Sequence, residues 1–306
     1  MISVAGTLVA DLTVRPIREW PSKGGVSFVE SIDVKHGGAV ANTGLALERL
    51  GVPVSAWGAV GDDNLGSVIK NLVGSWATHD AVSVLPSTRT TATIVAVAED
   101  GDRRFINALG ACDLFSLSEE QIDQQVAQGS RALHVGYAMI LPAFDGKPLI
   151  RAMRRATELG ALTSLDVTYF ETPRWPSLLE LMPEVDVFCP SLPEASAITG
   201  QSDAAAAAAV LVEAGVRQFV AVTDGPNGAL VHIPGEQPEW IQPLPVKVID
   251  TTGAGDAFVA GVLAAWYHGL PWSMAAKVGI KTASLAVTGR ERYEHLQSWD
   301  QVNPAA

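Results

Sequence analysis

The sequence has little cysteine, since its 306 residues contain only Cys112 and Cys189. The two lie far apart and show neither Cys-x-x-Cys nor Cys/His ligand spacing, which argues against a disulfide framework and against a zinc site. We therefore expect both to be small buried hydrophobic side chains.

Long apolar runs and an N-terminal targeting pattern are also missing. No run approaches the roughly 18 apolar residues of a membrane span, and residues 1–6 lack the charged segment that precedes the apolar part of a signal peptide. We expect a cytoplasmic protein without a membrane partner.

Positive charge is in deficit. The chain has 21 Lys and Arg against 33 Asp and Glu, a net charge of -12. Nucleic-acid binding depends on basic side chains that neutralise phosphates, so this balance argues against a nucleic-acid partner. A bound nucleotide would need local groups that overcome the repulsion, such as helix N-termini, backbone amides and Mg²⁺.

Three common active-site motifs are absent. No Gly-x-Gly-x-x-Gly follows the first predicted strand and no Gly-x-x-x-x-Gly-Lys-Ser/Thr occurs, which argues against a dinucleotide-binding oxidoreductase and a P-loop enzyme. Residues 36–39 (His-Gly-Gly-Ala) invite comparison with a lipase oxyanion loop, but the chain has no Gly-x-Ser-x-Gly segment to supply a nucleophile.

Short apolar runs that alternate with helical patterns fill much of the chain. The runs at 2–5, 54–60, 132–135, 162–165, 185–188 and 219–222 fit buried strands, and 40–50, 65–76, 148–159 and 204–214 fit amphipathic helices. Strand-like residues at 228–233 and 247–249 lead into apolar helices at 254–267 and 274–288. This order predicts one α/β domain over residues 1–306, a three-layer α/β/α sandwich around a mainly parallel sheet.

Two strand-like segments lack intervening helices. One is 26–34, and the other is a hairpin of 91–98 and 105–107 joined through an Asp-Gly turn. We expect a small antiparallel β lid formed by segments near 12–36 and 88–108, because closure over a site excludes water during group transfer. A β extension that only packs or dimerises fits the pattern equally well.

The strongest chemical signal is 248–258, which reads Val-Ile-Asp-Thr-Thr-Gly-Ala-Gly-Asp-Ala-Phe. A strand here runs through a Gly-rich turn into a helix, whose free N-terminal amides and dipole can hold a phosphate. Asp256 would lie beside that anion, within reach of an acceptor hydroxyl. A plainer alternative is that Asp256 is a first-turn helix carboxylate and the glycines only permit the turn.

The whole eleven-residue string resembles the C-terminal signature of the PfkB-type, or ribokinase-like, carbohydrate kinases. The resemblance runs from residue 4 to about residue 288, with further motifs in the expected order. It implies an ATP-dependent kinase in which Asp256 is the catalytic base. The backbone amides of Gly253, Ala254, Gly255 and Asp256 are implied to form the anion hole.

Two N-terminal motifs add to the resemblance. Residues 36–42 (His-Gly-Gly-Ala-Val-Ala-Asn) precede a helix, and the family likeness implies that Gly37, Gly38 and Asn42 line the sugar site. Paired glycines let the backbone approach a ligand closely, and an amide both donates to and accepts from hydroxyls. Asp11, after the first strand, is implied to bind the sugar through two hydroxyls.

The nucleotide and its metal have their own implied residues. The turn 223–228 resembles the family's nucleotide-phosphate loop, which implies ATP contacts at Thr223, Gly225 and Gly228 beside those at Thr252, Gly253 and Gly255. MgATP is expected in a groove over the last two helices.

Residues 190–194 fall where the family has Asn-x-x-Glu, although Ser191 replaces the asparagine. Glu194 is implied to orient a water on Mg²⁺. The resemblance also implies a monovalent cation such as K⁺ at Asp250.

The acceptor stays open among sugars, sugar acids, sugar phosphates and nucleosides. Arg89, Arg103 and Arg104 lie in or beside the predicted hairpin, and a guanidinium such as that of Arg104 facing the acceptor would suit an anionic sugar. A non-catalytic sugar or nucleoside sensor of the same fold is the other alternative, and a homodimer through the lid is expected.

Overall fold

The computed structural model describes residues 1–99, 103–289 and 292–304. Over these residues the main element is a nine-stranded sheet in the order β15-β14-β13-β12-β11-β10-β1-β4-β6. All neighbouring strands are parallel except β13–β14 and β14–β15. The strands are β1 (Ile2–Gly6), β4 (Val54–Trp57), β6 (His79–Asp80), β10 (Ala132–Ala138), β11 (Leu162–Val167), β12 (Val187–Phe188), β13 (Phe219–Thr223), β14 (Ala229–His232) and β15 (Glu239–Ile241).

The central strands are buried on both faces. Every residue of β1 and β11 is buried, and so are six of the seven residues of β10. A parallel sheet covered by helices on both sides requires such continuous apolar runs, which is why the pattern of the sequence located these strands.

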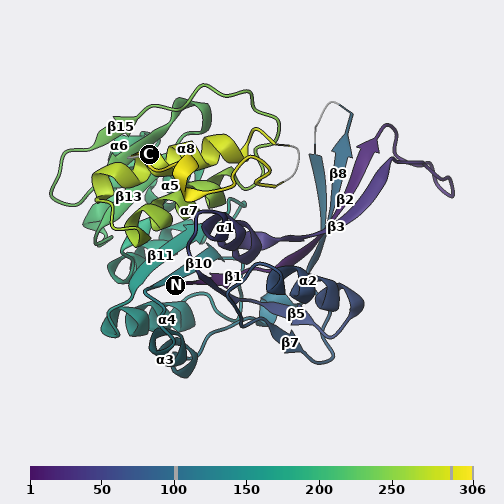
Figure 1. Ribbon diagram of the computed structural model, residues 1–306, viewed down its shortest axis with the longest axis horizontal. Coiled ribbons are helices and arrows are strands. Elements are labelled where there is room, and N and C mark those ends of the chain that lie inside the picture. Colours follow the sequence, from purple (N-terminus) through teal and green to yellow (C-terminus); the bar gives the residue numbers. More distant parts are fainter. Residues whose placement is uncertain (100–102, 290–291, 305–306) are drawn as a thin grey trace.

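Helices form the two outer layers (Figure 1). On one face, α1 (Gly38–Arg49), α7 (Ala254–Tyr267) and α8 (Trp272–Ala286) share a hydrophobic core with the sheet. The opposite core contains α3 (Glu119–Ala127), α4 (Lys147–Glu158), α5 (Leu192–Thr199) and α6 (Ala204–Glu213), and α2 (Asn64–Gly74) packs in a third cluster. Short 3-10 helices lie at Ala111–Leu114, Trp175–Glu184, Gly225–Asn227 and Trp299–Gln301. The predicted three-layer sandwich is confirmed.

A second, four-stranded sheet projects from this body as the lid, at the upper right of Figure 1. Its order is β3 (Ser31–Gly37), β2 (Val9–Ile17), β8 (Ala92–Ala98) and β9 (Arg103–Ala108). The pairs β3–β2 and β8–β9 are antiparallel, whereas the middle pair β2–β8 is parallel. The smaller sheet was predicted, but its parallel centre was not, because β2 was not recognised as a strand.

Some predicted boundaries differ from the structure. The run 54–60 splits at Gly58 into β4 and β5 (Ala59–Gly61), and β5 pairs with β7 (Ser83–Leu85) in a separate two-stranded sheet. Residues 26–30 lie outside any strand, and the predicted Asp-Gly turn at 100–101 lies outside the described residues.

The strand expected at 247–249 is wrong. Val248 and Ile249 are half exposed, and the amides of Ile249 and Asp250 both donate to the carbonyl of Val287 instead of joining a sheet. The segment is therefore held by the end of α8 and reaches α7 as a loop.

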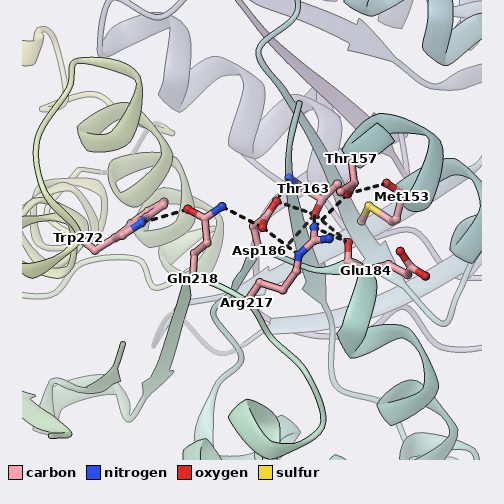
Figure 2. Close-up of polar contacts among 8 residues, drawn as sticks. All are labelled: Met153, Thr157, Thr163, Glu184, Asp186, Arg217, Gln218 and Trp272. Atoms are coloured by element: carbon pink, nitrogen blue, oxygen red, sulfur yellow. Dashed lines mark hydrogen bonds and ion pairs between the residues drawn. The ribbon is translucent and has the colours of Figure 1, made fainter. Parts of the chain in front are cut away.

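A polar network closes the edge of the sheet where the parallel strands begin (Figure 2). Asp186 is 5% exposed and accepts from the Thr163 amide at 2.8 Å, Arg217 Nε at 3.0 Å and Gln218 Nε2 at 2.9 Å. Gln218 in turn accepts from Trp272 at the start of α8 at 3.3 Å. The network ties β11, β12, β13 and α8 together at the edge opposite the carboxyl ends of these strands.

No helix within the described part of the chain is long and apolar enough to cross a bilayer.

Candidate active site

A cleft of about 1370 Å³ lies between the lid and the carboxyl ends of β1, β10 and β11. Thr7 follows β1, Tyr137 belongs to β10 and Thr168 follows β11, and all three line the cleft. Crevices at this edge of an open parallel sheet are the usual place for ligands, because strand ends and helix N-termini converge there.

The lid presents one face to this cleft. Asp11, Thr93, Arg103, Phe105 and Asn107 line it, at alternate positions of β2, β8 and β9. Successive side chains of a strand point to opposite faces, so the intervening residues of the lid face away from the cleft.

Asp256 lies in the first turn of α7, after Gly253 in the left-handed conformation (φ +74°). It is 3% exposed and accepts three hydrogen bonds from side chains. Asn42 Nδ2 donates to Oδ2 at 2.9 Å, Tyr137 donates to Oδ2 at 2.8 Å, and Thr43 donates to Oδ1 at 3.2 Å. Asn42 and Tyr137 both line the cleft, so they connect Asp256 to its floor.

The environment of Asp256 acts on its pKa in two directions. Burial raises the pKa of this carboxyl, whereas the hydrogen bonds from Asn42 and Tyr137, the charge of Arg292 and the hydrogen bond from Thr43 lower it. Burial has the largest effect, so the pKa of Asp256 lies above its ordinary value. The three donors and the charge of Arg292 are the groups that favour the ionised form, which a base requires.

The turn before α7 contains the amides predicted as an anion hole. The first amides of a helix have no acceptor within the helix. The Ala254 amide donates to the Thr251 carbonyl at 3.2 Å, so an anion held at Ala254 would replace that bond. Gly255 leaves open space where a side chain would begin.

The paired glycines pack against the first strands. A Cβ at Gly37 would collide with the carboxylate of Asp11, and Gly38 has φ +81° with its Cβ position against the Thr7 carbonyl. Thr7 also receives the Ala39 amide at Oγ1 at 3.1 Å. Glycine is required at both positions because the start of α1 approaches β2 and Thr7 this closely.

Asp11 is paired with a residue that sequence reasoning missed. Arg292 Nη2 lies 3.4 Å from Asp11 Oδ2, and Arg292 Nη1 donates to the His36 carbonyl at 2.6 Å. Burial raises the pKa of Asp11, and Arg292 lowers it. Of the predicted sugar residues, Asp11, Gly38 and Asn42 line the cleft together with Arg292. Gly37 lies outside the lining, packed against the Asp11 carboxylate.

Arg103 joins the lid to the loop before α7. Its guanidinium lies 2.5 Å from Asp250 Oδ2 and donates to Thr252 Oγ1. Asp250 and Thr252 both line the cleft.

Arg104, which was predicted to face the acceptor, does not line the cleft. It lies on the other face of β9 and lines a small separate pocket with Ile17 and Trp20. The alternation of the strand therefore turns Arg103, and not the predicted Arg104, toward the cleft.

The other predicted nucleotide and metal residues are not part of the cleft lining. Thr223 ends β13, and Gly225 and Gly228 have φ +48° and +103° in the following turn. Glu194 is 9% exposed and accepts the Ser191 amide at 2.7 Å at the start of α5. Ser191 is the N-cap residue of α5, and its backbone amide holds the Glu194 carboxylate although the side chain is not an asparagine.

Asp166, at the end of β11, is a further buried carboxyl that sequence reasoning missed. Burial raises its pKa well above the ordinary value, and the negative charges of Asp256 and Glu194 raise it further. Burial likewise raises the pKa of Glu194. The sequence signal for Asp166 was its position directly after the predicted strand 162–165.

The described residues contain no group of three or more His, Cys, Asp or Glu side chains that could hold a metal ion.

A doubly wound fold with a smaller sheet over the carboxyl ends of its strands, and a buried carboxylate at a helix N-terminus beside the cleft, form a site suited to group transfer with water excluded. Residues 2–298 match the model of the pfkB family of carbohydrate kinases. The chain belongs to this family and is a sugar phosphotransferase.

Individual relatives with similar sequences or structures are also sugar kinases by name. The chain is 29% identical over 255 residues to probable fructokinase-7 of Arabidopsis thaliana, covering 79% of this chain and 74% of that protein. Ribokinase of Arabidopsis thaliana, solved with ribose and ATP, superposes with a TM-score of 0.83 at 24% identity over 98% of this chain and 96% of its own. A putative ribokinase II of E. coli with ATP and Mg²⁺ gives 0.78 at 22% identity, over 98% and 97%. The two structures confirm the ribokinase-like fold.

Proposed function

We propose that this protein transfers the γ-phosphoryl group of ATP to a hydroxyl of a neutral, fructose-like sugar, with Asp256 as the general base. One observation carries the proposal. Asp256 is buried at the N-terminus of α7 and is hydrogen-bonded to Asn42 and Tyr137 on the floor of the cleft. A base in this position meets a hydroxyl that enters from the cleft.

The proposed reaction is a phosphoryl transfer coupled to one proton transfer. The acceptor oxygen forms a bond to the γ-phosphorus as the bond to the ADP oxygen breaks, and the hydroxyl proton passes to Asp256. The amides of Gly253 to Asp256 stabilise the charge on the phosphoryl oxygens, in the way that helix N-termini hold anions. Contacts of ATP with Thr223, Gly225, Gly228 and Thr252 belong to the same proposal.

Mg²⁺ fits the charges around the base, and it would also offset the charge of the ATP phosphates. Asp256 and Glu194 raise the pKa of Asp166, and Asp256 that of Glu194, so a divalent cation bound near these buried carboxyls would offset their repulsion. Mg²⁺ keeps several waters, which suits a site where Glu194 binds through water. The E. coli neighbour was solved with ATP and Mg²⁺.

A monovalent cation such as K⁺ at Asp250 is a separate part of the proposal. The carboxylate of Asp250 pairs with Arg103, so a monovalent cation there would compete with the guanidinium. Comparing rates in potassium, sodium and choline salts tests it, and equal rates would remove the K⁺ site.

A neutral sugar is favoured by the charges of the cleft. Four cations line the cleft, namely Arg15, Lys35, Arg103 and Arg292. Arg292 is paired with Asp11, Arg103 with Asp250 and Arg15 with Asp33, and Lys35 also has an interaction within the chain, so each is already engaged before an anionic acceptor enters. Arg104, the residue predicted for that task, faces away. The curated relative is named a fructokinase.

The test is an ATP-consumption screen over sugars, sugar acids, sugar phosphates and nucleosides. Fructose or a similar neutral sugar should give the highest kcat/KM. Preference for a nucleoside or a sugar phosphate would overturn the assignment of the acceptor. Sugar binding without ATP turnover would instead identify a sensor.

We also propose a homodimer through the outer face of the lid, which we define as Leu12, Ile32, Val34, Ile94 and Ile106. Leu12 pairs with Val34 and Ile94, Ile94 pairs with Ile106, and Ile32 lies two residues from Val34 on the same face of β3. Ile32 and Ile106 are 65% and 55% exposed. An exposed apolar sheet face of this kind favours burial against a second copy. The predicted cytoplasmic location and the absence of nucleic-acid partners stay predictions.

A further inference from the structure

Tyr137 lies where strand β10 loses its regular pairing. The register between β10 and β11 shifts between Val135 and Ala138, and Tyr137 has φ +59°. A non-glycine residue in the left-handed region is strained, and such strain persists only where the surroundings fix it. Bulges next to active sites serve to redirect a side chain.

The irregularity changes the layer that Tyr137 faces. Leu133 and Val135 point into the hydrophobic core formed with α3, α4, α5 and α6, and regular alternation would place Tyr137 on that same side. Its hydroxyl instead contacts Asp256 of α7 and Asn42 of α1, on the other side of the sheet.

The two oxygens of Asp256 have different surroundings. Oδ1 accepts from Thr43, which is fully buried, whereas Oδ2 accepts from Asn42 and Tyr137, which both line the cleft. Oδ2 is therefore the oxygen on the cleft side. Asn42 Nδ2 also lies 3.4 Å from the Tyr137 oxygen, which closes a triangle of polar contacts.

Resting on the proposed role of Asp256, we propose that Tyr137 is a positioning residue for the transfer, whose phenol O–H fixes Oδ2 of Asp256 in the direction from which the acceptor hydroxyl approaches. Neither the family signature nor the glycine motif contains this residue. The left-handed backbone, the shifted register and the partly buried hydrogen bond to Asp256 together place the Tyr137 hydroxyl at Oδ2.

A phenol suits this role because it stays protonated. Burial raises the pKa of Tyr137 well above its ordinary value, and the charge of Asp256 raises it further, so the hydroxyl remains a donor throughout the working pH range. Without it, Oδ2 keeps only Asn42, and the pKa of Asp256 rises because one group that lowers it is lost.

The first test is Tyr137→Phe, which keeps the ring and removes the hydroxyl. We expect kcat/KM for the sugar to fall by roughly tenfold or more, and the acid limb of its pH profile to move to higher pH. Tyr267→Phe, in the last turn of α7 and outside the cleft lining, is the matched control and should keep wild-type kinetics. A Tyr137→Phe enzyme with wild-type kcat/KM and an unmoved acid limb would overturn the proposal.

Two further measurements separate positioning from other effects. In an Asp256→Asn background, Tyr137→Phe should cost nothing more, because no carboxylate is left to position; an equal loss in both backgrounds would contradict the proposal. Carbon-13 NMR titration of the Asp256 carboxyl in the unliganded protein requires no turnover. A higher Asp256 pKa in Tyr137→Phe supports the contact even if the proposed reaction is wrong, and an unchanged pKa refutes it.

Discussion

At the scale of single residues, the site lowers the stability of the fold because it buries three carboxyl groups. Asp166, Glu194 and Asp256 are 6%, 9% and 3% exposed, and the charges of the other two raise the pKa of Asp166. A carboxylate in such surroundings is less stable than in water, since desolvation is only partly offset by hydrogen bonds. The chain keeps these groups at the expense of stability, as functional sites commonly do.

Asp166→Asn tests this cost through the pH dependence of stability. Because the folded pKa of Asp166 lies above its ordinary value of 3.8, the native state binds this proton more tightly than the unfolded state does. Its contribution is favourable below 3.8 and is lost as pH rises through the raised pKa. The variant should therefore melt about 2 °C or more above wild type at pH 8, with the difference gone near pH 4.

Thermal melts of both proteins from pH 4 to pH 9 check this. Melting temperatures that differ by the same amount at every pH would show that the charge of Asp166 is not the cause.

Some residues of the site could be predicted from the sequence and others could not. Asp256, Asn42 and Asp11 lie in or beside the cleft as their motifs predicted, because each belongs to a local pattern tied to one strand end or helix start. Tyr137 was not found, because a register shift is invisible in the pattern of β10. Arg292 was not found either, because it reaches Asp11 only after the chain beyond α8 folds back over the cleft.

At the scale of elements, the lid is a sheet with two different faces. One face lines the cleft with polar residues such as Asp11, Thr93 and Asn107, and the outer face is apolar. The strand predicted at 26–34 overlaps β3 only at residues 31–34. The strand at 247–249 failed as a prediction because an apolar triplet says nothing about whether a partner strand lies beside it, and here none of the described strands does.

The outer face gives a prediction for assembly. The double variant Ile32→Glu and Val34→Glu places like charges at the proposed dimer interface, so the mass in solution should fall from dimer to monomer. Sedimentation or light scattering measures it. Val84→Glu, equally exposed on β7 and away from the lid, is the control and should leave the mass unchanged. A wild-type monomer, or a variant that remains a dimer, contradicts the proposed interface.

At the scale of the whole molecule, the two ends of the strands in the large sheet have different roles. The carboxyl ends of the strands hold the cleft, and the amino ends are fastened by the network around Asp186 (Figure 2). The layered fold followed from the alternation of strands and helices in the sequence. The Asp186 network did not, because its members lie in four separate segments joined only by folding.

Asp186→Ala should therefore destabilise the protein without touching the cleft. It leaves Arg217 Nε and Gln218 Nε2 without their acceptor, although Arg217 Nη2 keeps its bonds to Thr157, Thr163 and the Glu184 carbonyl. A polar group left without its partner in such surroundings costs about 1–3 kcal/mol. Urea unfolding should give a lower midpoint, while KM for ATP and sugar stays at wild-type values in the folded protein. An unchanged midpoint would mean that the network contributes nothing to stability.

Turnover of Asp256→Asn with ATP and the best sugar from the screen shows whether Asp256 is the general base. The amide keeps the size of the side chain but cannot take the proton, so kcat should fall by roughly 10² or more while calorimetry finds both ligands bound with near wild-type affinity. Asp123→Asn on the surface of α3 is the control for losing one carboxylate. An Asp256→Asn enzyme that turns over at nearly the wild-type rate would contradict the assignment of Asp256 as the base.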